Sequence, residues 1–339
     1  MKAAVLHEFR KPLVLEDVAR PELAPDEVLI KVEACGVCHS DLHVADGDWP
    51  QFSRITKIPL ILGHEVAGRV SALGDAVHGL NVGDHVGVPW IYWTCGECES
   101  CREGNENLCS KQQITGVSVD GGYAEFVKAP GSHTQKIPSG LSSIEAAPLF
   151  CAGVTVYRAL SQAKISSGLR LAVFGVGGLG QVAVQIGTNL GAQVTAVDVS
   201  EEKLATATAL GAFRTLNAAA TNVVKEFRSI GGAHVAIVTS AAKAAYDTAF
   251  SCLRSRGTLL VVGLPSENIC FPPIMMAAGE VHIQASAVGT RKDLREVLAM
   301  AAAGKLRCQV AARPLAQVNE VLEELRQGKI AGRVVLTPQ

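Results

Sequence analysis

The pattern of hydrophobic and polar positions along this 339-residue chain changes near Cys151. Up to about residue 150, short runs rich in β-branched residues are broken by glycine and aspartate, as in "EVLIKVEACGV", "GHEVAGRVSALG" and "GGYAEFVKAP". Such runs are typical of strands separated by turns, and helical periodicity is weak in this part of the chain. The first half is therefore predicted to form an irregular β domain.

From about residue 152 to 285, β-like apolar runs alternate with helix-like segments. "LRLAVFG" precedes the helix-like "LGQVAVQIGTNLG", and the further apolar runs "AQVTAVDV", "HVAIVTS" and "TLLVVGLP" follow. Strand, helix and strand at this spacing predict a parallel sheet that is covered on both faces. Beyond it, "RKDLREVLAMAAAG" and "LAQVNEVLEELRQG" are helix-like, and "GRVVLTP" predicts a last strand.

Composition and charge narrow the classes of function. Hydrophobic residues make up 48% of the chain and charged residues 19%, but no apolar run approaches the ~20 residues that span a bilayer. With a net charge of -1 and no dense tract of Lys and Arg, a nucleic-acid or polybasic membrane role has no electrostatic support. The N-terminal apolar run is interrupted by charged residues, unlike a signal peptide, so we expect the protein in the cytoplasm.

One glycine-rich stretch has the context of a dinucleotide-binding turn. "FGVGGLG" places Gly175, Gly177 and Gly180 in the pattern G-x-G-x-x-G, after a predicted strand and at the start of a predicted helix. The next predicted strand ends in Asp198, whose carboxylate would bind the adenosine ribose and repel a 2′-phosphate. The stretch therefore predicts NAD binding rather than NADP binding, and a βα turn without a ligand is the alternative.

Four of the ten cysteines lie within fifteen residues, at Cys95, Cys98, Cys101 and Cys109. In a reducing compartment such a cluster is more typical of a metal site than of disulfides. Four thiolates close the tetrahedral coordination of zinc and leave no position for a substrate, so a zinc ion here would be structural. An iron–sulfur centre uses the same ligands and is the alternative.

A second group of metal-binding residue types lies in "CGVCHSDLH" and "GHEVAG". A catalytic zinc needs three protein ligands and one open position. Cys38 and His64 could supply two of these ligands, but spacing alone does not identify the third.

These motifs together resemble the zinc-dependent alcohol dehydrogenases of the medium-chain dehydrogenase/reductase superfamily. "GHEVAGRVSALGDAV" fits the family pattern G-H-E-x2-G-x5-[GA]-x2-[IVSAC] at every fixed position, and "CGVCHSDLH", the four-cysteine segment, "FCAGVTVY" and "GVGGLG" occur in family order. The resemblance covers essentially the whole chain and is greatest to the shorter bacterial alcohol dehydrogenases. It implies an α/β fold: a Rossmann doubly wound parallel sheet over residues 152–286, and a GroES-like β-rich catalytic domain over 1–151 and 287–339, with a structural zinc lobe at about 93–112.

The resemblance also implies a reaction, in which small primary alcohols are oxidised to aldehydes by hydride transfer to NAD, and the reverse. Secondary alcohols, which give ketones, and aromatic alcohols are alternative substrates. A subunit would hold two zinc ions, one catalytic and one structural, and a homotetramer is expected. The residues matched to the catalytic zinc are its ligands Cys38, His64 and Cys151, the nearby Glu65, and Asp41, which orients the ligand histidine. Ser40 and His43 would carry the substrate proton away, through a ribose hydroxyl of the cofactor.

The positions matched to cofactor binding are His39, Thr155, Gly175, Gly177, Gly178, Leu179, Gly180, Asp198, Lys203, Val262, Gly263, Leu264 and Arg333. Thr155 and the segment 262–264 would lie near the nicotinamide, and Arg333 near the pyrophosphate. His39 stands where some family members have arginine, so we predict weaker and pH-dependent cofactor binding. Trp49 and Trp90 match positions that line the substrate channel of bacterial relatives, although ordinary packing is the alternative for both.

Three other functions compete with this interpretation. A polyol or formaldehyde-type dehydrogenase of the same superfamily would share most of these motifs. A non-enzymatic nucleotide-binding protein would be expected to lack zinc ligands, which this chain retains. A redox metalloprotein would use the four cysteines for an iron–sulfur centre.

Overall fold

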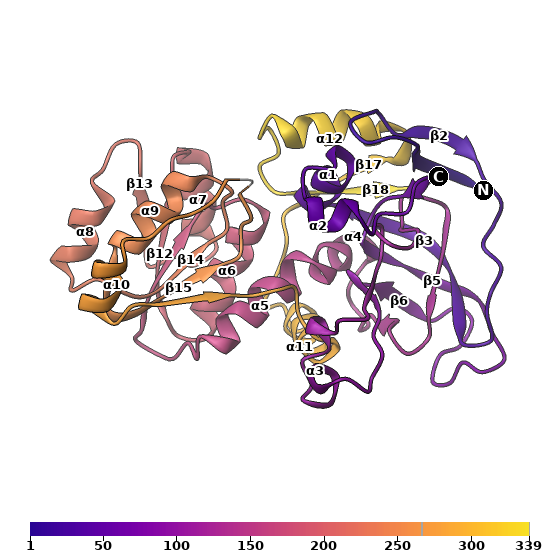
Figure 1. Ribbon diagram of the computed structural model, residues 1–339, viewed down its shortest axis with the longest axis horizontal. Coiled ribbons are helices and arrows are strands. Elements are labelled where there is room, and N and C mark those ends of the chain that lie inside the picture. Colours follow the sequence, from indigo (N-terminus) through magenta and orange to yellow (C-terminus); the bar gives the residue numbers. More distant parts are fainter. Residues whose placement is uncertain (266, 339) are drawn as a thin grey trace. The chain divides into compact units, whose positions relative to one another are not determined.

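The computed structural model describes residues 1–265 and 267–338 (Figure 1). The chain divides into two compact units, one formed by Met1–Val154 with Thr290–Gln339, and the other by Thr155–Gly289. Among the described residues, no helix is both long and apolar enough to cross a membrane.

The unit Thr155–Gly289 is built on a six-stranded parallel sheet with the strand order β13-β12-β11-β14-β15-β16. Its strands are β11 (Arg170–Phe174), β12 (Gln193–Asp198), β13 (Arg214–Asn217), β14 (Ala233–Val238), β15 (Leu253–Val261) and β16 (His282–Ala285). The chain builds outward from β11 to β13 and then returns to β14 on the other side of β11. This reversal confirms the predicted doubly wound sheet, and ligands of such sheets bind beyond the carboxyl ends of the strands at the reversal.

Helices cover both faces of this sheet. Successive side chains of β11 point to opposite faces, and those of Leu171–Phe174 are apolar and buried, so both faces need cover. Leu171 faces α6, where a Cβ on Gly187 would lie 2.5 Å from its Cδ2 atom. Phe174 belongs instead to a buried cluster with Phe227 of α8 and Tyr246 of α9. The helices of this unit are α5 (Ala152–Gln162), which begins in the other unit, α6 (Gly178–Asn189), α7 (Glu201–Ala209), α8 (Val223–Ser229), α9 (Lys243–Ser251) and α10 (Pro273–Gly279).

The other unit is β-rich, as predicted, and its largest sheet is organised around β3. This strand pairs antiparallel with β5, with β9 and with β18. The strands of the sheet are β3 (Glu27–Val37), β5 (Glu65–Leu73), β6 (His85–Val88), β9 (Phe126–Pro130), β10 (Gln135–Lys136), β17 (Val310–Pro314) and β18 (Arg333–Thr337). Two smaller sheets contain β1 (Lys2–Leu6), β2 (Val14–Asp17) and β4 (Leu60–Ile61), and β7 (Ile91–Trp93) with β8 (Gln113–Ile114).

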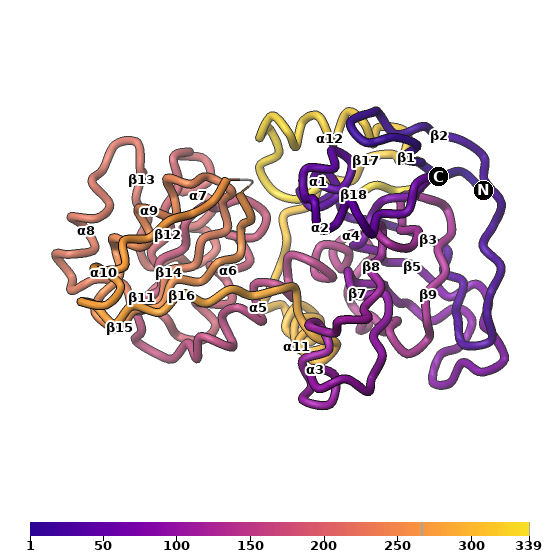
Figure 2. Tube along the Cα trace, viewed as in Figure 1, coloured from indigo at the N-terminus to yellow at the C-terminus, as the bar shows by residue number. Residues whose placement is uncertain are grey.

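The last strand returns the end of the chain to the first half of the sequence. Figure 2 shows β18 beside β3, and the register pairs Val335 with Gly36, which is itself paired with Glu65 of β5. Arg333, at the start of β18, is thereby carried to the carboxyl end of β3. This is the place from which the functional residues project.

Short helices connect and flank these strands. They are α1 (His39–Asp46), α2 (Pro50–Ser53), α3 (Glu99–Arg102), α4 (Ser143–Ala146), α11 (Arg291–Ala302) and α12 (Val318–Arg326), with single 3-10 turns at η1 (Glu106–Leu108), η2 (Ala147–Phe150) and η3 (Leu315–Gln317). The predicted helix at α11 starts at a capping box between Thr290 and Asp293. It buries Leu294, Val297, Leu298 and Ala301, the spacing of one helix face.

Candidate functional site

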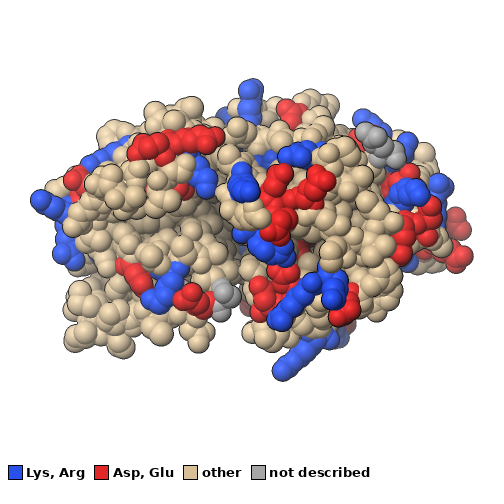
Figure 3. Space-filling model, turned by 90° about the horizontal axis from the view of Figure 1, so that it is seen from above, with Lys and Arg blue, Asp and Glu red and all other residues tan. Residues whose placement is uncertain are grey.

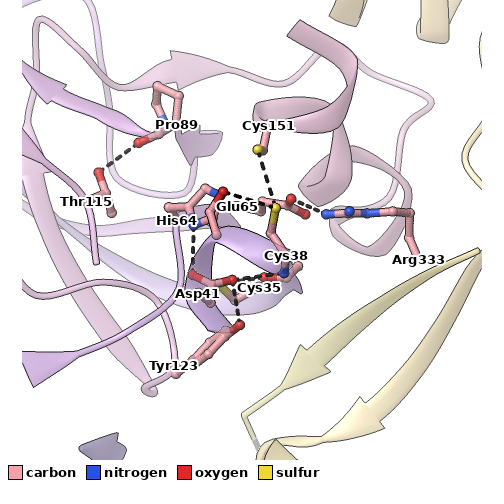
Figure 4. A network of polar contacts seen from close by, with 12 residues as sticks. Cys35, Cys38, Asp41, His64, Glu65, Pro89, Thr115, Tyr123, Cys151 and Arg333 are labelled. Carbon is pink, nitrogen blue, oxygen red and sulfur yellow. Dashed lines mark hydrogen bonds and ion pairs between the residues drawn. The ribbon is translucent and has the colours of Figure 1, made fainter. Parts of the chain in front are cut away.

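Three residues that are distant in sequence converge at the end of β3. Cys38 caps α1 immediately after β3, His64 directly precedes β5, and Cys151 follows η2. Their ligand atoms, together with a carboxylate oxygen of Glu65, all lie within 4.8 Å of one another (Figure 4). The two sulfur atoms are 3.9 Å apart, and all four residues are buried. The structure thus brings together the residues that the family resemblance paired with the catalytic zinc.

The donor atoms of this cluster fit a zinc ion. His64 Nδ1 lies 2.8 Å from Asp41 Oδ1, so this nitrogen carries the hydrogen and Nε2 has a free lone pair. Nε2 is buried and has no hydrogen-bond partner within the described part of the chain. A buried polar atom without a partner is unusual unless it binds a ligand. Two thiolates and one imidazole nitrogen are a donor set that zinc accepts.

The electrostatics of the cluster shift the pKa values of its three candidate ligands in different directions. The hydrogen bond from the Cys151 thiol lowers the pKa of Cys38 well below its ordinary value, and the same contact raises the pKa of Cys151. Burial lowers the pKa of His64, but Asp41 and Cys38 together outweigh this effect and raise the pKa well above its ordinary value. Metal binding requires both sulfurs as thiolates and the imidazole neutral, so it would release protons here.

The four-cysteine segment forms a second convergent group in the loop between β7 and β8. The sulfur atoms of Cys95, Cys98, Cys101 and Cys109 lie within 4.8 Å of one another. The Cys98 N–H lies 3.4 Å from the Cys95 sulfur, and the Cys95 N–H lies 3.5 Å from the Cys109 sulfur. Backbone N–H groups, first that of Glu97 and then that of Cys98, lower the pKa of Cys95 to about 6. Such donors favour thiolates, as a tetrahedral metal site requires.

The glycine turn after β11 has the backbone geometry that the sequence predicts. Gly175 has φ +88°, and a Cβ there would lie 2.9 Å from Ser240 Cβ. A Cβ on Gly180 would lie 1.9 Å from the Gly175 carbonyl oxygen, whereas Gly177 has no neighbouring atom within 4 Å. The first and third glycines are therefore needed for the turn and for close packing of the helix. The second leaves open space before α6, suited to a pyrophosphate.

Comparison with known proteins identifies the family of the chain. Residues 24–139 match the family model "Alcohol dehydrogenase GroES-like domain", and residues 178–303 match "Zinc-binding dehydrogenase". An alcohol dehydrogenase of Geobacillus stearothermophilus is 47% identical, with 99% of each chain covered. The chain belongs to the zinc-dependent alcohol dehydrogenases of the medium-chain dehydrogenase/reductase superfamily. Among solved structures, the alcohol dehydrogenase of Aeropyrum pernix is 37% identical over 100% of both chains, with a TM-score of 0.93. Acetophenone reductase of Geotrichum candidum, solved in complex with NAD, is 32% identical over 99% of this chain and 96% of that chain, with a TM-score of 0.89.

In this alcohol dehydrogenase, Asp198 holds the glycine turn as well as ending β12. Its Oδ2 atom accepts a hydrogen bond from the Val176 N–H at 2.7 Å. Its Oδ1 atom accepts from the N–H groups of Val199 and Ser200 at 2.8 and 3.0 Å. The carboxylate is therefore fixed beside the turn, and its binding of a ribose stays a prediction. Lys203 lies in α7 and is half-buried.

Two residues that the sequence analysis did not indicate, Thr239 and Tyr246, hydrogen-bond to the backbone of this dinucleotide site. The Thr239 hydroxyl donates to the Gly175 carbonyl oxygen at 2.7 Å, and the Tyr246 hydroxyl donates to that of Gly263. Gly263 lies between Val262, which is buried, and Leu264, which is half-exposed. Thr239 and Tyr246 follow β14, the strand next to the glycine strand, and no local motif marks them. The remaining predicted cofactor residues also have defined places: Gly178 and Leu179 open α6, Thr155 is buried in α5, and His39 begins α1 and is exposed.

Arg333 and Glu65 form a buried ion pair next to the sulfur cluster, with the guanidinium Nη2 donating to Glu65 Oε1 (Figure 4). Burial raises the pKa of Glu65 to about 7, against the opposing effect of Arg333. A Cβ on Gly36 would lie 1.8 Å from Glu65 Oε2, so the glycine makes room for the carboxylate. The sequence did not indicate this pair, and the contact of Arg333 with a pyrophosphate stays a prediction.

The two residues predicted to carry a proton lie on α1. The Ser40 hydroxyl oxygen is 3.7 Å from the Cys38 sulfur. His43 Nδ1 lies 2.9 and 3.0 Å from the two carboxylate oxygens of Asp48, and the imidazole ring stacks on Trp49 at 4.3 Å. Asp48 was not predicted, although an acidic residue directly after the helix-ending Gly47 is a visible local signal.

The two predicted pocket tryptophans belong to one aromatic cluster. Trp90 meets the ring of His64 edge-on at 4.8 Å and packs on Phe52 at 5.8 Å. Phe52 in turn lies 5.4 Å from Trp49. The cluster therefore extends from the candidate metal ligand to the ring of His43, and Phe52 is a member that the sequence did not indicate.

The four-cysteine segment is attached to α11 and to a buried histidine. Arg291 donates to Glu106 Oε1 through both its backbone N–H and its Nε, at 3.0 and 3.1 Å. His133 is 4% exposed and lies between the hydroxyl groups of Thr94 and Ser132, at 3.0 and 2.9 Å. Burial, followed by the charge of Arg291, lowers the pKa of His133 to about 4.

This histidine predicts a loss of stability in mild acid. Its pKa in the unfolded chain is about 6.5, so between pH 6.5 and 4 the unfolded chain binds a proton that the folded protein does not. The free energy of unfolding should therefore fall as the pH is lowered through this range, by up to about 3 kcal/mol from His133. Urea unfolding at pH 7, 5.5 and 4.5 measures this fall, which should be smaller in His133→Gln. An equal fall in both proteins would contradict the assignment.

Proposed function

We propose that this dehydrogenase oxidises small primary alcohols to aldehydes by hydride transfer to NAD, and catalyses the reverse reduction. Secondary alcohols, which give ketones, and aromatic alcohols are further substrates of the same site. The observation that carries the proposal is the convergence of two buried sulfur atoms on an imidazole nitrogen without a partner. We assign residues 1–151 and 287–339 to catalysis and residues 152–286 to NAD binding.

Cys38, His64 and Cys151 would hold the catalytic zinc ion. Zinc at this place supplies Lewis acidity, which lowers the pKa of an alcohol hydroxyl. Asp41 keeps the hydrogen on His64 Nδ1 and thus fixes the ligand tautomer. The aromatic cluster of Trp49, Phe52 and Trp90 would form an apolar wall for the substrate chain. Cys95, Cys98, Cys101 and Cys109 would hold a second, structural zinc ion, which gives two ions per chain.

The chain offers its own acceptors for the proton of the alcohol. The Ser40 hydroxyl, close to the Cys38 sulfur, would accept this proton while it gives up its own hydrogen toward His43. His43 donates from Nδ1 to Asp48, so Nε2 is the atom that can accept a proton and release it to solvent. Asp48 also stabilises the imidazolium that forms, as a carboxylate partner does for a general base.

Replacing His43 with alanine should slow turnover more at neutral pH than at alkaline pH. Without the imidazole the proton leaves slowly near neutrality, whereas hydroxide can accept it directly at high pH. General bases contribute about 10²–10⁴-fold, and because only the exit of the proton is affected we expect about tenfold to hundredfold at pH 7. The pH profile of kcat from pH 6.5 to 10 measures this effect. A loss of the same size at every pH would count against proton transfer by His43.

The support for NAD lies in Asp198 and the glycine turn. The carboxylate is held rigidly by three backbone N–H groups beside the turn, where a 2′-phosphate would meet its negative charge. Some family members have arginine at the position of His39 on α1. Compared with arginine, His39 would bind the cofactor phosphates more weakly, because it carries charge only when protonated.

The protein is further proposed to be a homotetramer in the cytoplasm. The edge strand β16 and the adjacent α10 expose apolar side chains that a second copy could cover: Ile283 is 38% exposed, Met275 55% and Ile274 74%.

On the face drawn in Figure 3, acidic and basic side chains are intermixed, which gives a nucleic acid no continuous basic path over that face.

The test is NADH formation from NAD with ethanol, a longer primary alcohol, a secondary alcohol and benzyl alcohol, each with and without a zinc chelator. We expect chelator-sensitive turnover, fastest with a small primary alcohol. No turnover of any of these alcohols by zinc-replete protein that binds NAD would contradict the proposed function.

A further inference from the structure

We propose that Tyr123 is a positioning residue for the candidate metal ligand His64 and acts on it through Asp41. Tyr123 lies three residues before β9 and is separated from Asp41 by 82 positions in the sequence. The inference rests on the proposed zinc role of Cys38, His64 and Cys151. It adds a residue that touches neither the substrate nor the cofactor to the determinants of metal affinity.

The first observation is the set of contacts around Asp41. The Tyr123 hydroxyl donates to Asp41 Oδ2 at 2.9 Å, and the Cys38 N–H donates to the same oxygen at 2.9 Å. The other oxygen, Oδ1, accepts from His64 Nδ1 at 2.8 Å. Both Asp41 and His64 have side chains that are 1% exposed. The carboxylate is therefore held by three donors, and two of these belong to the candidate metal ligands themselves (Figure 4).

The second observation is that Tyr123 also contacts the backbone before His64. A Cβ on Gly63 would lie 2.5 Å from Tyr123 Cδ1, and Gly63 has φ +95°. The Tyr123 N–H donates to the Leu62 carbonyl at 2.9 Å, and the Gly122 N–H donates to that of Gly63 at 2.8 Å. The ring of Tyr123, which is fully buried, thus fits against a glycine that must remain a glycine. Backbone and side chain of His64 are both held from this one segment.

The hydroxyl group can only serve as a donor in this position. Burial, followed by the charge of Asp41, raises the pKa of Tyr123 well above its ordinary value, so the phenol stays protonated. A donor to Asp41 Oδ2 fixes the plane of the carboxylate and hence the direction of Oδ1 toward His64 Nδ1. The imidazole ring of His64 is then already oriented, with Nε2 toward the two sulfur atoms, before a metal binds. Preorganisation of this kind strengthens metal binding.

The test variant is Tyr123→Phe, which keeps the ring against Gly63 and removes only the hydroxyl. Loss of a residue that contacts a metal ligand costs about 10–100-fold in metal affinity, and because Tyr123 acts through Asp41 we expect about tenfold. The Kd for zinc at the catalytic site is measured by competition with a chromophoric chelator. The visible absorption of the cobalt-substituted protein should also shift, because the ring orientation of His64 changes.

A matched control is available within the same unit. Tyr92→Phe also removes a hydrogen bond from a tyrosine hydroxyl to a carboxylate, that of Glu27 at 3.0 Å, and Tyr92 is 5% exposed. Glu27 is not among the residues of either cysteine cluster. We expect both variants to lose similar thermal stability, but only Tyr123→Phe to lose zinc affinity and to change the cobalt spectrum.

Two further variants separate the possible failures. Asp41→Ala should weaken zinc binding more than Tyr123→Phe, and adding Tyr123→Phe to it should have no further effect. Equal zinc affinity in Tyr123→Phe, Tyr92→Phe and the unmodified protein would overturn the role of Tyr123. If Cys151→Ala and Tyr123→Phe both bound zinc like the unmodified protein, the proposed metal site itself would be wrong. If Cys151→Ala lost one zinc ion and Tyr123→Phe kept normal zinc affinity, only the role of Tyr123 would be overturned.

Discussion

Replacing Cys151 with alanine should lower kcat/KM for alcohol oxidation by about three orders of magnitude and leave NADH binding intact. Cys151 supplies one of the two sulfur atoms of the buried cluster, 3.9 Å from that of Cys38. Without it the cluster keeps the Cys38 thiol, the His64 imidazole and the Glu65 carboxylate. Because Arg333 already engages this carboxylate, zinc would be held only weakly. Lewis-acid stabilisation is worth several kcal/mol, and about 4 kcal/mol corresponds to a thousandfold loss of rate. Steady-state kinetics with ethanol, and NADH fluorescence for binding, measure the two quantities.

The control for this prediction is a neighbouring thiol outside the cluster. Cys35 is fully buried and lies three residues before Cys38, but it is not among the residues whose ligand atoms converge with those of Cys38 and Cys151. Cys35→Ala removes a buried thiol of the same kind and is therefore a matched control. It should keep turnover within a few-fold of the unmodified protein, because Cys35 is outside the metal cluster. Activity of Cys151→Ala within tenfold of the unmodified protein would refute the assignment.

Arg333→Ala is expected to lower the free energy of unfolding by about 3–5 kcal/mol. Glu65 is 0% exposed and Arg333 8%, and removal of one partner leaves the other buried without its counter-charge. Breaking a buried ion pair in this way costs far more than the pair itself contributes. Urea unfolding at neutral pH measures the change. The double variant Glu65→Gln/Arg333→Ala should recover part of the loss, because neither member of the pair is then left charged and buried without its partner.

An exposed arginine serves as the comparison. Arg326 pairs with Glu323 and Asp46 at the surface, and its side chain is 46% exposed. Surface pairs contribute about 0–1 kcal/mol, so Arg326→Ala should change the free energy of unfolding by about 1 kcal/mol or less. Equal effects of Arg326→Ala and Arg333→Ala would contradict the account of the Glu65–Arg333 pair.

The sequence predicted best what is determined by local spacing. The glycine turn and the four-cysteine segment each lie within a single loop, so their residues must be close in any fold. The alternation of apolar runs and helices likewise predicted the parallel sheet, since each strand–helix unit has its own pattern. From its residue pattern the β-rich unit was predicted only as irregular, because its strands are paired by residues far apart in sequence. Its GroES-like assignment came from the family resemblance.

The remainder of the site depends on the register of distant strands. Cys151 is 113 positions from Cys38 and was found by family resemblance rather than by spacing. Glu65 and Arg333 are 268 positions apart and meet only because β3 pairs with both β5 and β18. The contact of Tyr123 with Asp41 arises in the same way. No local pattern of residue types encodes such pairs.

The central claim is that alcohol oxidation depends on the metal held by Cys38, His64 and Cys151, and that the four-cysteine segment has a structural role. The most direct measurement is the zinc content per chain of the unmodified protein and of Cys151→Ala, together with their turnover. We predict two zinc ions per chain in the active protein, and one in an inactive, folded Cys151→Ala. Two ions in Cys151→Ala, or loss of one ion with turnover unchanged, would contradict the claim.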